Sequence, residues 1–202
     1  IQMEDGPRIQ KFSFGCRIGV MYLDQHLSNP GQILMGTSIA MQMAKNLGNR
    51  DVVIYSPEMN AQILAEKEIS MNYGKALAKR EFLVYYQPKV EIETGKIIGA
   101  EALARWMKQE ELLEPAAFIP ALERNGSICK LDFYVLDMAC RDLKNWILEG
   151  NEAYCISSNF SRWNLKESDF VERILQVVDR YQLEHHFIEL EITETSSFED
   201  YD

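Results

Sequence analysis

A membrane-spanning helix requires about 18 consecutive apolar residues, and no apolar run in the sequence approaches that length. The sequence also shows no signal peptide at its start. Basic residues are also scarce, since 21 Lys and Arg stand against 31 Asp and Glu and give a net charge of −10. This charge argues against non-specific binding to nucleic acid polymers or anionic membranes. An anionic ligand would need a metal ion or a few placed basic side chains. We expect a cytoplasmic chain, whose parent protein could carry a sensor or membrane region upstream.

Cysteine is rare as well. Its four positions lie far apart among apolar residues and form no C-x-x-C motif: Cys16, Cys129, Cys140 and Cys155. Buried free thiols in a reducing compartment fit this spacing better than disulfides do. Hydrophobic residues make up 47% and charged residues 26% of the chain, which is ordinary for a globular protein.

Hydrophobic periodicity predicts strands and helices in alternation. Strands are expected at 10–23, 51–55, 82–103 (two, around a turn at Thr94–Gly95), 153–161 and 187–193, and helices at 37–48, 57–80, 115–124, 128–149 and 166–183. The order strand, helix, strand after residue 150 is typical of a parallel βα unit, so we expect an α/β barrel or open sheet. The strands after residue 82 are too few to close an eight-stranded barrel, so we expect the chain to stop partway.

The stretch GAEALARWMKQEELLE, residues 99–114, has two interpretations. Its composition favours a helix, in which Glu101 and Arg105 would form a surface i,i+4 ion pair. As the end of a strand, the same stretch would place Glu101 and Arg105 on one face, pointing into a common site. The residues alone leave both interpretations open.

Five segments in register settle the choice by resemblance. YYQP, GAEALARW, FIP, NFS and ELEITET occur in the order and spacing of the EAL family of cyclic di-GMP phosphodiesterases, which residues 81–202 resemble over the first half of such a domain. The resemblance implies an α/β fold, a partial TIM-like (β/α) barrel of EAL type. It also implies that the EAL stretch is a strand to about Leu103, followed by a turn or helix.

The first 59 residues are similar to a different family. GCRIGVMYL, SIAMQMAKNLGNR and DVVIYSPEM resemble the C-terminal part of an α/β GGDEF-like domain, with Cys16-Arg17-Ile18-Gly19 where that family usually has Ser-Ile-Gly. The loop that names the family is not in this chain, and nothing supports cyclase activity. We therefore expect a GGDEF-like part at 1–59, a linker helix at 60–80 and the N-terminal half of an EAL domain at 81–202.

The resemblance implies a metal site for Mg²⁺ or Mn²⁺. Glu101, Asn159 and Glu191 match the family's ligand positions, and each carries a hard oxygen donor at or just beyond the end of a predicted strand. Taken singly, the three have plainer interpretations, as a helix surface charge, a loop-capping amide and an exposed strand charge. Their joint register favours ligands.

Three further residues have implied roles. Arg105 matches the arginine that binds substrate phosphate, and Gln87 matches a residue lining the guanine pocket. Glu194 matches the acid that supports an active-site loop.

The implied function is metal-dependent hydrolysis of cyclic di-GMP to linear pGpG by the intact parent protein. The family's paired aspartates, its lysine and a later glutamate would lie after Asp202, so we expect the fragment itself to be inactive. The alternative is a non-catalytic cyclic di-GMP receptor, or a protein-interaction module, with a degenerate EAL domain. Because a partial barrel exposes strand edges and apolar surface, we also expect the fragment to be poorly soluble or to associate with a second copy.

Overall fold

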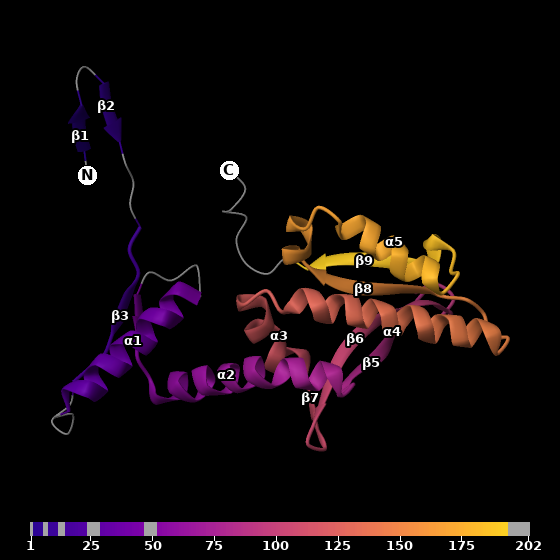
Figure 1. The fold of residues 1–202 in the computed structure, drawn as a ribbon, viewed down its shortest axis with the longest axis horizontal. Coiled ribbons are helices and arrows are strands. Elements are labelled where there is room, and N and C mark those ends of the chain that lie inside the picture. Colours follow the sequence, from indigo (N-terminus) through magenta and orange to yellow (C-terminus); the bar gives the residue numbers. More distant parts are fainter. Residues whose placement is uncertain (1, 6–7, 12–14, 24–28, 47–51, 194–202) are drawn as a thin grey trace. The chain divides into compact units, whose positions relative to one another are not determined.

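The computed structural model describes residues 2–5, 8–11, 15–23, 29–46 and 52–193, and it divides into one unit up to Ala65 and a second from Glu66 (Figure 1). The division lies within a single long helix, α2 (Pro57–Ala78). Among the described residues, no helix is long and apolar enough to cross a membrane. The assignment of the first unit to a GGDEF-like domain stays a prediction.

The first unit pairs short strands with one helix. Strands β1 (Gln2–Asp5) and β2 (Arg8–Lys11) form an antiparallel hairpin, and β3 (Ile18–Val20) pairs in parallel with β4 (Val52–Ile54). Helix α1 (Pro30–Asn46) packs on the β3–β4 pair, and its buried residues Ala40 and Ala44 allow a close approach.

Helix α1 begins earlier than the sequence analysis predicted. Thr37, the first residue of the predicted helix, lies inside α1, and its hydroxyl donates back to the carbonyl of Ile33 at 2.9 Å. The helix instead starts at Pro30, where the side chain of Asn29 accepts the backbone N–H of Gly31 at 2.9 Å. An Asx residue followed by proline is the more reliable start signal, since proline at the first helical position loses no hydrogen bond.

The second unit is a mixed sheet covered by helices on one face. Its strands are β5 (Phe82–Val90), β6 (Ile97–Lys108), β7 (Glu111–Leu113), β8 (Cys155–Ser161) and β9 (Ile188–Thr193), in the order β5-β6-β8-β9 with β7 also paired to β6. β5 and β6 are antiparallel, whereas β6, β8 and β9 are parallel.

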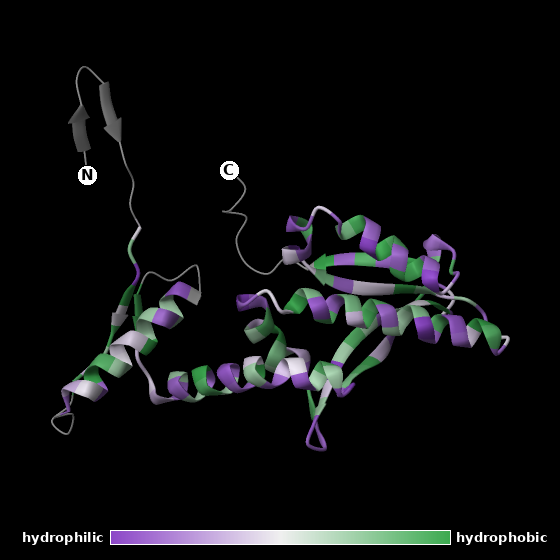
Figure 2. Ribbon diagram, in the orientation of Figure 1, coloured by the Kyte–Doolittle hydropathy of each residue, from purple (hydrophilic) through white to green (hydrophobic). Residues whose placement is uncertain are grey.

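The helices of this unit are α3 (Pro115–Arg124), α4 (Ile128–Leu148) and α5 (Phe170–Arg180), with the short 3₁₀ turns η1 (Arg162–Lys166) and η2 (His185–Phe187). α4 packs against β5, β6 and β8, and α5 packs beside α4. Apolar and polar residues are interspersed along both helices (Figure 2). This pattern is expected of a helix that buries one face and exposes the other. These bounds confirm the helices predicted at 115–124 and 128–149 and the two strands around the Thr94–Gly95 turn, whereas the helix predicted at 166–183 covers only Phe170–Arg180.

Strand alternation separates an apolar face from a polar face. The face toward the helices carries the buried side chains of Ala102, Ile156 and Phe160. Phe82 and Trp106 are also buried, and the centres of their rings lie 4.9 Å apart. The residues between them point the other way. The residues that face the helices form the hydrophobic core. The residues on the opposite face of the sheet are therefore available to form a binding site.

The hairpin between β6 and β7 turns through two residues in the left-handed region. Gln109 has φ 48° and Glu110 has φ 72°, and Lys108 pairs with Glu111 across the turn. Such turns favour Asn-Gly, since other residues are strained there.

We therefore expect the double substitution Gln109→Asn, Glu110→Gly to raise the free energy of unfolding by about 1 kcal/mol. Urea titration would measure it. Glu110→Ala is the control, because it removes the side chain and keeps the strain. A double variant no more stable than wild type would contradict the strain argument.

The cysteines only partly follow the expectation. All four are free, and Cys140 is buried, but Cys16 is exposed.

Candidate functional site

Glu101 lies on a strand, not on a helix. β6 pairs with β5 from Phe82 to Val90 on one side and with β8 on the other, and this pairing overrides the helical propensity of the stretch. The strand continues past Leu103 to Lys108, and β7 follows it, so the expected turn or helix after Leu103 is a hairpin instead.

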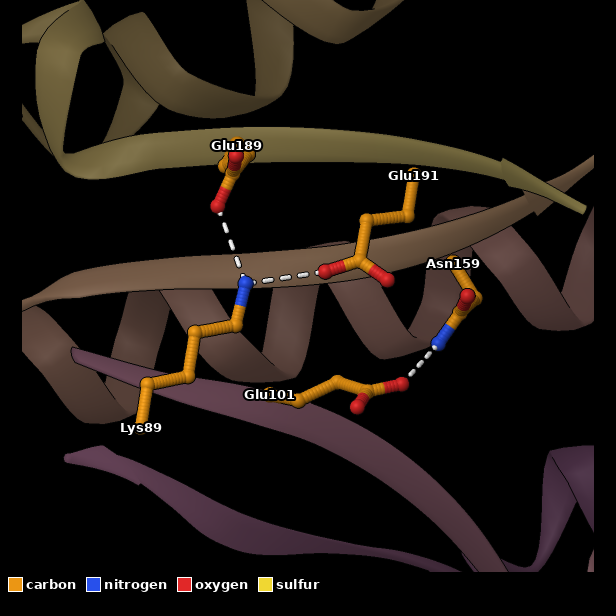
Figure 3. Close-up of polar contacts among 5 residues, drawn as sticks. All are labelled: Lys89, Glu101, Asn159, Glu189 and Glu191. Carbon is orange, nitrogen blue, oxygen red and sulfur yellow. Dashed lines mark hydrogen bonds and ion pairs between the residues drawn. The ribbon is translucent and has the colours of Figure 1, made fainter. Parts of the chain in front are cut away.

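Glu101 shares a face with the other two predicted ligands. It pairs in register with Ser157 on β8, and Asn159, two residues further along β8, pairs with Glu191 on β9. Paired residues on adjacent strands point to the same side. The Asn159 amide Nδ2 donates to Glu101 Oε1 at 2.7 Å (Figure 3). We call this side of the sheet the polar face; its members are Gln87, Lys89, Glu101, Asn159, Glu189 and Glu191.

Lys89 is a member that the sequence analysis missed. Its ammonium Nζ donates to Glu191 Oε1 at 2.9 Å and to Glu189 Oε2 at 3.0 Å (Figure 3). The hydrogen bonds that Lys89 donates to Glu191 and Glu189 raise the pKa of Lys89 to about 12, and Lys89 in turn lowers the pKa of Glu191. Period-two alternation from Gln87 would have placed Lys89 on the same face.

Arg105 is engaged by a residue other than Glu101. Its Nε lies 3.1 Å from Glu114 Oε2, its Nη1 donates to the carbonyl of Ala104 at 2.9 Å, and its guanidinium carbon lies 5.6 Å from the centre of the Tyr85 ring. The i,i+4 pair with Glu101 is therefore wrong, because residues four apart on a strand do not meet as they do on a helix. The Arg105 side chain is only 16% exposed and is held in one orientation.

Two remaining predictions have different outcomes. Gln87 is exposed on β5 and pairs in register with Glu101, so it borders the candidate ligands. Glu194 lies outside the described residues.

A buried carboxylate fixes the end of β8. Asp132 on α4 accepts the backbone N–H of Ser161 at 2.9 Å and the Asn164 amide at 2.7 Å, both at Oδ2. Ser161 is two residues beyond Asn159, so this contact sets where β8 ends. The sequence analysis missed Asp132 because it lies within a helical pattern, where an acid is usually solvated.

Burial raises the pKa of Asp132 from 3.8 to about 7, although the Ser161 and Asn164 hydrogen bonds oppose this shift. Between about pH 4 and pH 7 the unfolded chain releases this proton while the folded chain keeps it. The free energy of unfolding should therefore fall as pH rises through this window, by up to about 1.4 kcal/mol per pH unit.

Asp132→Asn should remove this dependence, because the amide does not titrate. Urea titrations from pH 4.5 to 8 on both proteins would measure the difference. A difference between wild type and variant that stays constant with pH would contradict the raised pKa.

The donor chemistry of the polar face fits a hard divalent ion. Glu101, Asn159 and Glu191 offer carboxylate and amide oxygens on three neighbouring strands, which Mg²⁺ and Mn²⁺ prefer. In the part of the chain that the structure describes, no three His, Cys, Asp or Glu side chains gather closely enough to hold a metal by themselves. The set is thus two carboxylates completed by an amide.

Comparison with known proteins identifies the family of the chain. A sequence model of the EAL domain matches residues 71–202. The bifunctional diguanylate cyclase/cyclic di-GMP phosphodiesterase MucR of Pseudomonas aeruginosa is 31% identical over 172 residues, which are 85% of this chain and 25% of that protein. The cyclic di-GMP phosphodiesterase PdeR of Escherichia coli is 28% identical over 185 residues, which are 91% of this chain and 28% of that protein.

A solved structure shares the fold. The PaMucR phosphodiesterase, in complex with c-di-GMP, has a TM-score of 0.60 and 33% sequence identity, over 66% of this chain and 54% of that one. The chain therefore spans about a quarter of the length of the two curated relatives and about half of the solved chain. The predicted fold class, a partial TIM-like α/β fold, is confirmed, and the chain belongs to the EAL domain family.

Proposed function

We propose that a protein carrying this chain and the rest of the barrel hydrolyses cyclic di-GMP to linear pGpG with Mg²⁺ or Mn²⁺. The observation that carries the proposal is the placement of Glu101, Asn159 and Glu191 on one face of three adjacent strands, with Asn159 and Glu101 2.7 Å apart. The names of the relatives and the c-di-GMP complex of PaMucR support the choice of substrate.

In this proposal the three residues hold the metal through oxygen atoms. Glu101 and Glu191 bring two negative charges and Asn159 brings a neutral carbonyl oxygen. When bound, a divalent ion stabilises charge on a phosphoryl oxygen and lowers the pKa of a coordinated water. The Asn159 amide nitrogen, which donates to Glu101, leaves its carbonyl oxygen available to a ligand.

Arg105 would bind a phosphate of the substrate. A guanidinium has five N–H donors, of which Arg105 directs one at Glu114 and one at the carbonyl of Ala104. The outer edge of the guanidinium remains for the two oxygens of a phosphodiester. The contacts with Glu114 and Tyr85 reduce the entropy that Arg105 loses when it binds.

Gln87 and Glu194 complete the proposed roles. Gln87 would contact guanine from β5, beside Glu101. Glu194 would support a neighbouring loop. Because the chain spans 54% of the solved PaMucR chain, we propose that turnover needs the rest of the barrel and that this chain alone is inactive.

The test is incubation of the full-length protein with cyclic di-GMP and Mg²⁺ or Mn²⁺, followed by chromatography of the products. Formation of pGpG, lost on chelation with EDTA, supports the proposal. Binding without hydrolysis would instead identify a cyclic di-GMP receptor. Absence of both would leave a protein-interaction module.

A further inference from the structure

The polar face already contains a cation of its own. Lys89 comes from β5, yet its ammonium contacts two carboxylates on β9, at 2.9 Å and 3.0 Å. Strands β6 and β8 lie between β5 and β9 in the sheet. Lys89 therefore crosses the face, and its register partner on β6 is Gly99, which has no side chain to obstruct it.

Gly99 is constrained to be glycine by the sheet itself. A Cβ at this position would lie 2.6 Å from the carbonyl oxygen of Cys155, which is backbone and cannot move aside. The gap that Lys89 crosses is thus part of the fold.

Lys89 binds a carboxylate that the metal site also needs. It contacts Glu191 through Oε1, and Figure 3 shows the second oxygen of Glu191 directed toward Asn159. An ion held by Glu101, Asn159 and Glu191 would therefore share the Glu191 carboxylate with the Lys89 ammonium. Two cations that contact the same carboxylate repel each other, and they compete for the negative charge of Glu191.

The charges of the face suggest a balance between the two cations. Glu101, Glu189 and Glu191 carry three negative charges, and Lys89 neutralises one of them. Without Lys89 or a metal, no cation would balance the three carboxylates on β6 and β9, which repel one another.

We propose that Lys89 is a built-in competitor of the divalent metal, which stabilises the polar face in the absence of metal and weakens the binding of metal to Glu191. This inference rests on the proposed function, because it concerns the same metal site. Lys89 would thereby set the metal concentration at which the site fills.

The experiment is titration of the full-length protein with Mn²⁺, followed by electron paramagnetic resonance of the free ion. Lys89→Met should bind Mn²⁺ at least tenfold more tightly than wild type, because it removes the charge and keeps the length of the side chain. Lys89→Arg should stay within about twofold, because it keeps the charge. Lys108→Met is the matched control, since Lys108 pairs with Glu68 at 2.6 Å outside the polar face, and its affinity should equal that of wild type.

A second measurement separates competition from damage to the fold. In EDTA, Lys89→Met should melt at a lower temperature than wild type. Saturating Mn²⁺ should raise the melting temperature of Lys89→Met by more than it raises that of wild type. Unchanged or weaker Mn²⁺ binding by Lys89→Met would overturn the inference, whatever its melting temperature.

Glu101→Gln in the Lys89→Met background shows which site is filled. The gain in affinity should disappear, because Glu101 is a proposed ligand and Lys89 does not contact it. A gain that persists would place the ion elsewhere and overturn the inference. If wild type binds Mn²⁺ and Lys89→Met binds it equally, this inference alone fails, whereas failure of both proteins to bind would also refute the proposed metal site.

Discussion

Glu101→Gln in the full-length protein is expected to reduce the rate of cyclic di-GMP hydrolysis by about a hundredfold or more. The change replaces a charged ligand oxygen with a neutral amide and keeps the size of the side chain, and altering even the partners of metal ligands typically costs 10- to 100-fold. The amide nitrogen would also compete with Asn159, which now donates to Glu101 Oε1. Steady-state kinetics at saturating substrate would measure the loss in kcat.

Glu93→Gln is the control for Glu101→Gln. Glu93 lies exposed in the turn between β5 and β6 and undergoes the same change in charge. Its activity should equal that of wild type. Substrate affinity in Glu101→Gln should change less than kcat, since Arg105 is untouched. A Glu101→Gln protein with more than a tenth of wild-type kcat would show that Glu101 is not a metal ligand.

Asp132→Ala is expected to lower the free energy of unfolding by about 3 kcal/mol. The substitution removes the acceptor that the Ser161 N–H and the Asn164 amide share, although the amide still donates to the carbonyl of Ser161 at 3.1 Å. A buried donor left without its acceptor costs about 1–3 kcal/mol. The loss is partly offset near neutral pH, because burial already disfavours the ionised carboxylate. Urea titration at pH 5, where Asp132 is protonated, gives the clearest value.

Two further variants of α4 serve as controls for Asp132→Ala. Asp132→Asn keeps an acceptor oxygen and should lose less than Asp132→Ala. Asp137→Ala removes a carboxylate on the same helix that pairs with Arg180 at the surface, so it should cost less than about 1 kcal/mol. Equal losses in Asp132→Ala and Asp137→Ala would mean that the buried acceptor contributes no more than a surface ion pair.

Strand and helix identities in the second unit followed well from periodicity, because each element buries one face. The exception was the stretch around Glu101, where Ala, Leu and Glu favour a helix. This stretch forms a strand because it pairs with β5 on one side and with β8 on the other. The local sequence gives no sign of either pairing. Family resemblance supplied what propensity could not.

The site was predictable where side chains follow strands and unpredictable where they meet across the sheet. Glu101, Asn159 and Glu191 share one face of the sheet, but they lie within β6, β8 and β9 and not, as was predicted, at or just beyond the strand ends. The contacts of Lys89 with β9 and of Asp132 with the end of β8 join residues far apart in the chain. Those contacts depend on how the sheet curves and how α4 lies on it, which a single sequence does not state.

The pairing of Arg105 with Glu114 illustrates the same limit. Glu114 immediately precedes α3, and only the hairpin of β6 and β7 brings it back beside Arg105. The sequence analysis offered Glu101 as the partner of Arg105 only under its helical interpretation, and neither of its two interpretations pointed to Glu114.

The most direct test of the account is to locate a metal in crystals of the full-length protein grown with Mn²⁺. Anomalous diffraction should place a manganese ion within coordination distance of oxygens of Glu101, Asn159 and Glu191, with the carbonyl oxygen of Asn159 facing the ion. Manganese bound elsewhere, or none on the polar face at saturating concentration, would contradict the central claim that these three residues form a metal site.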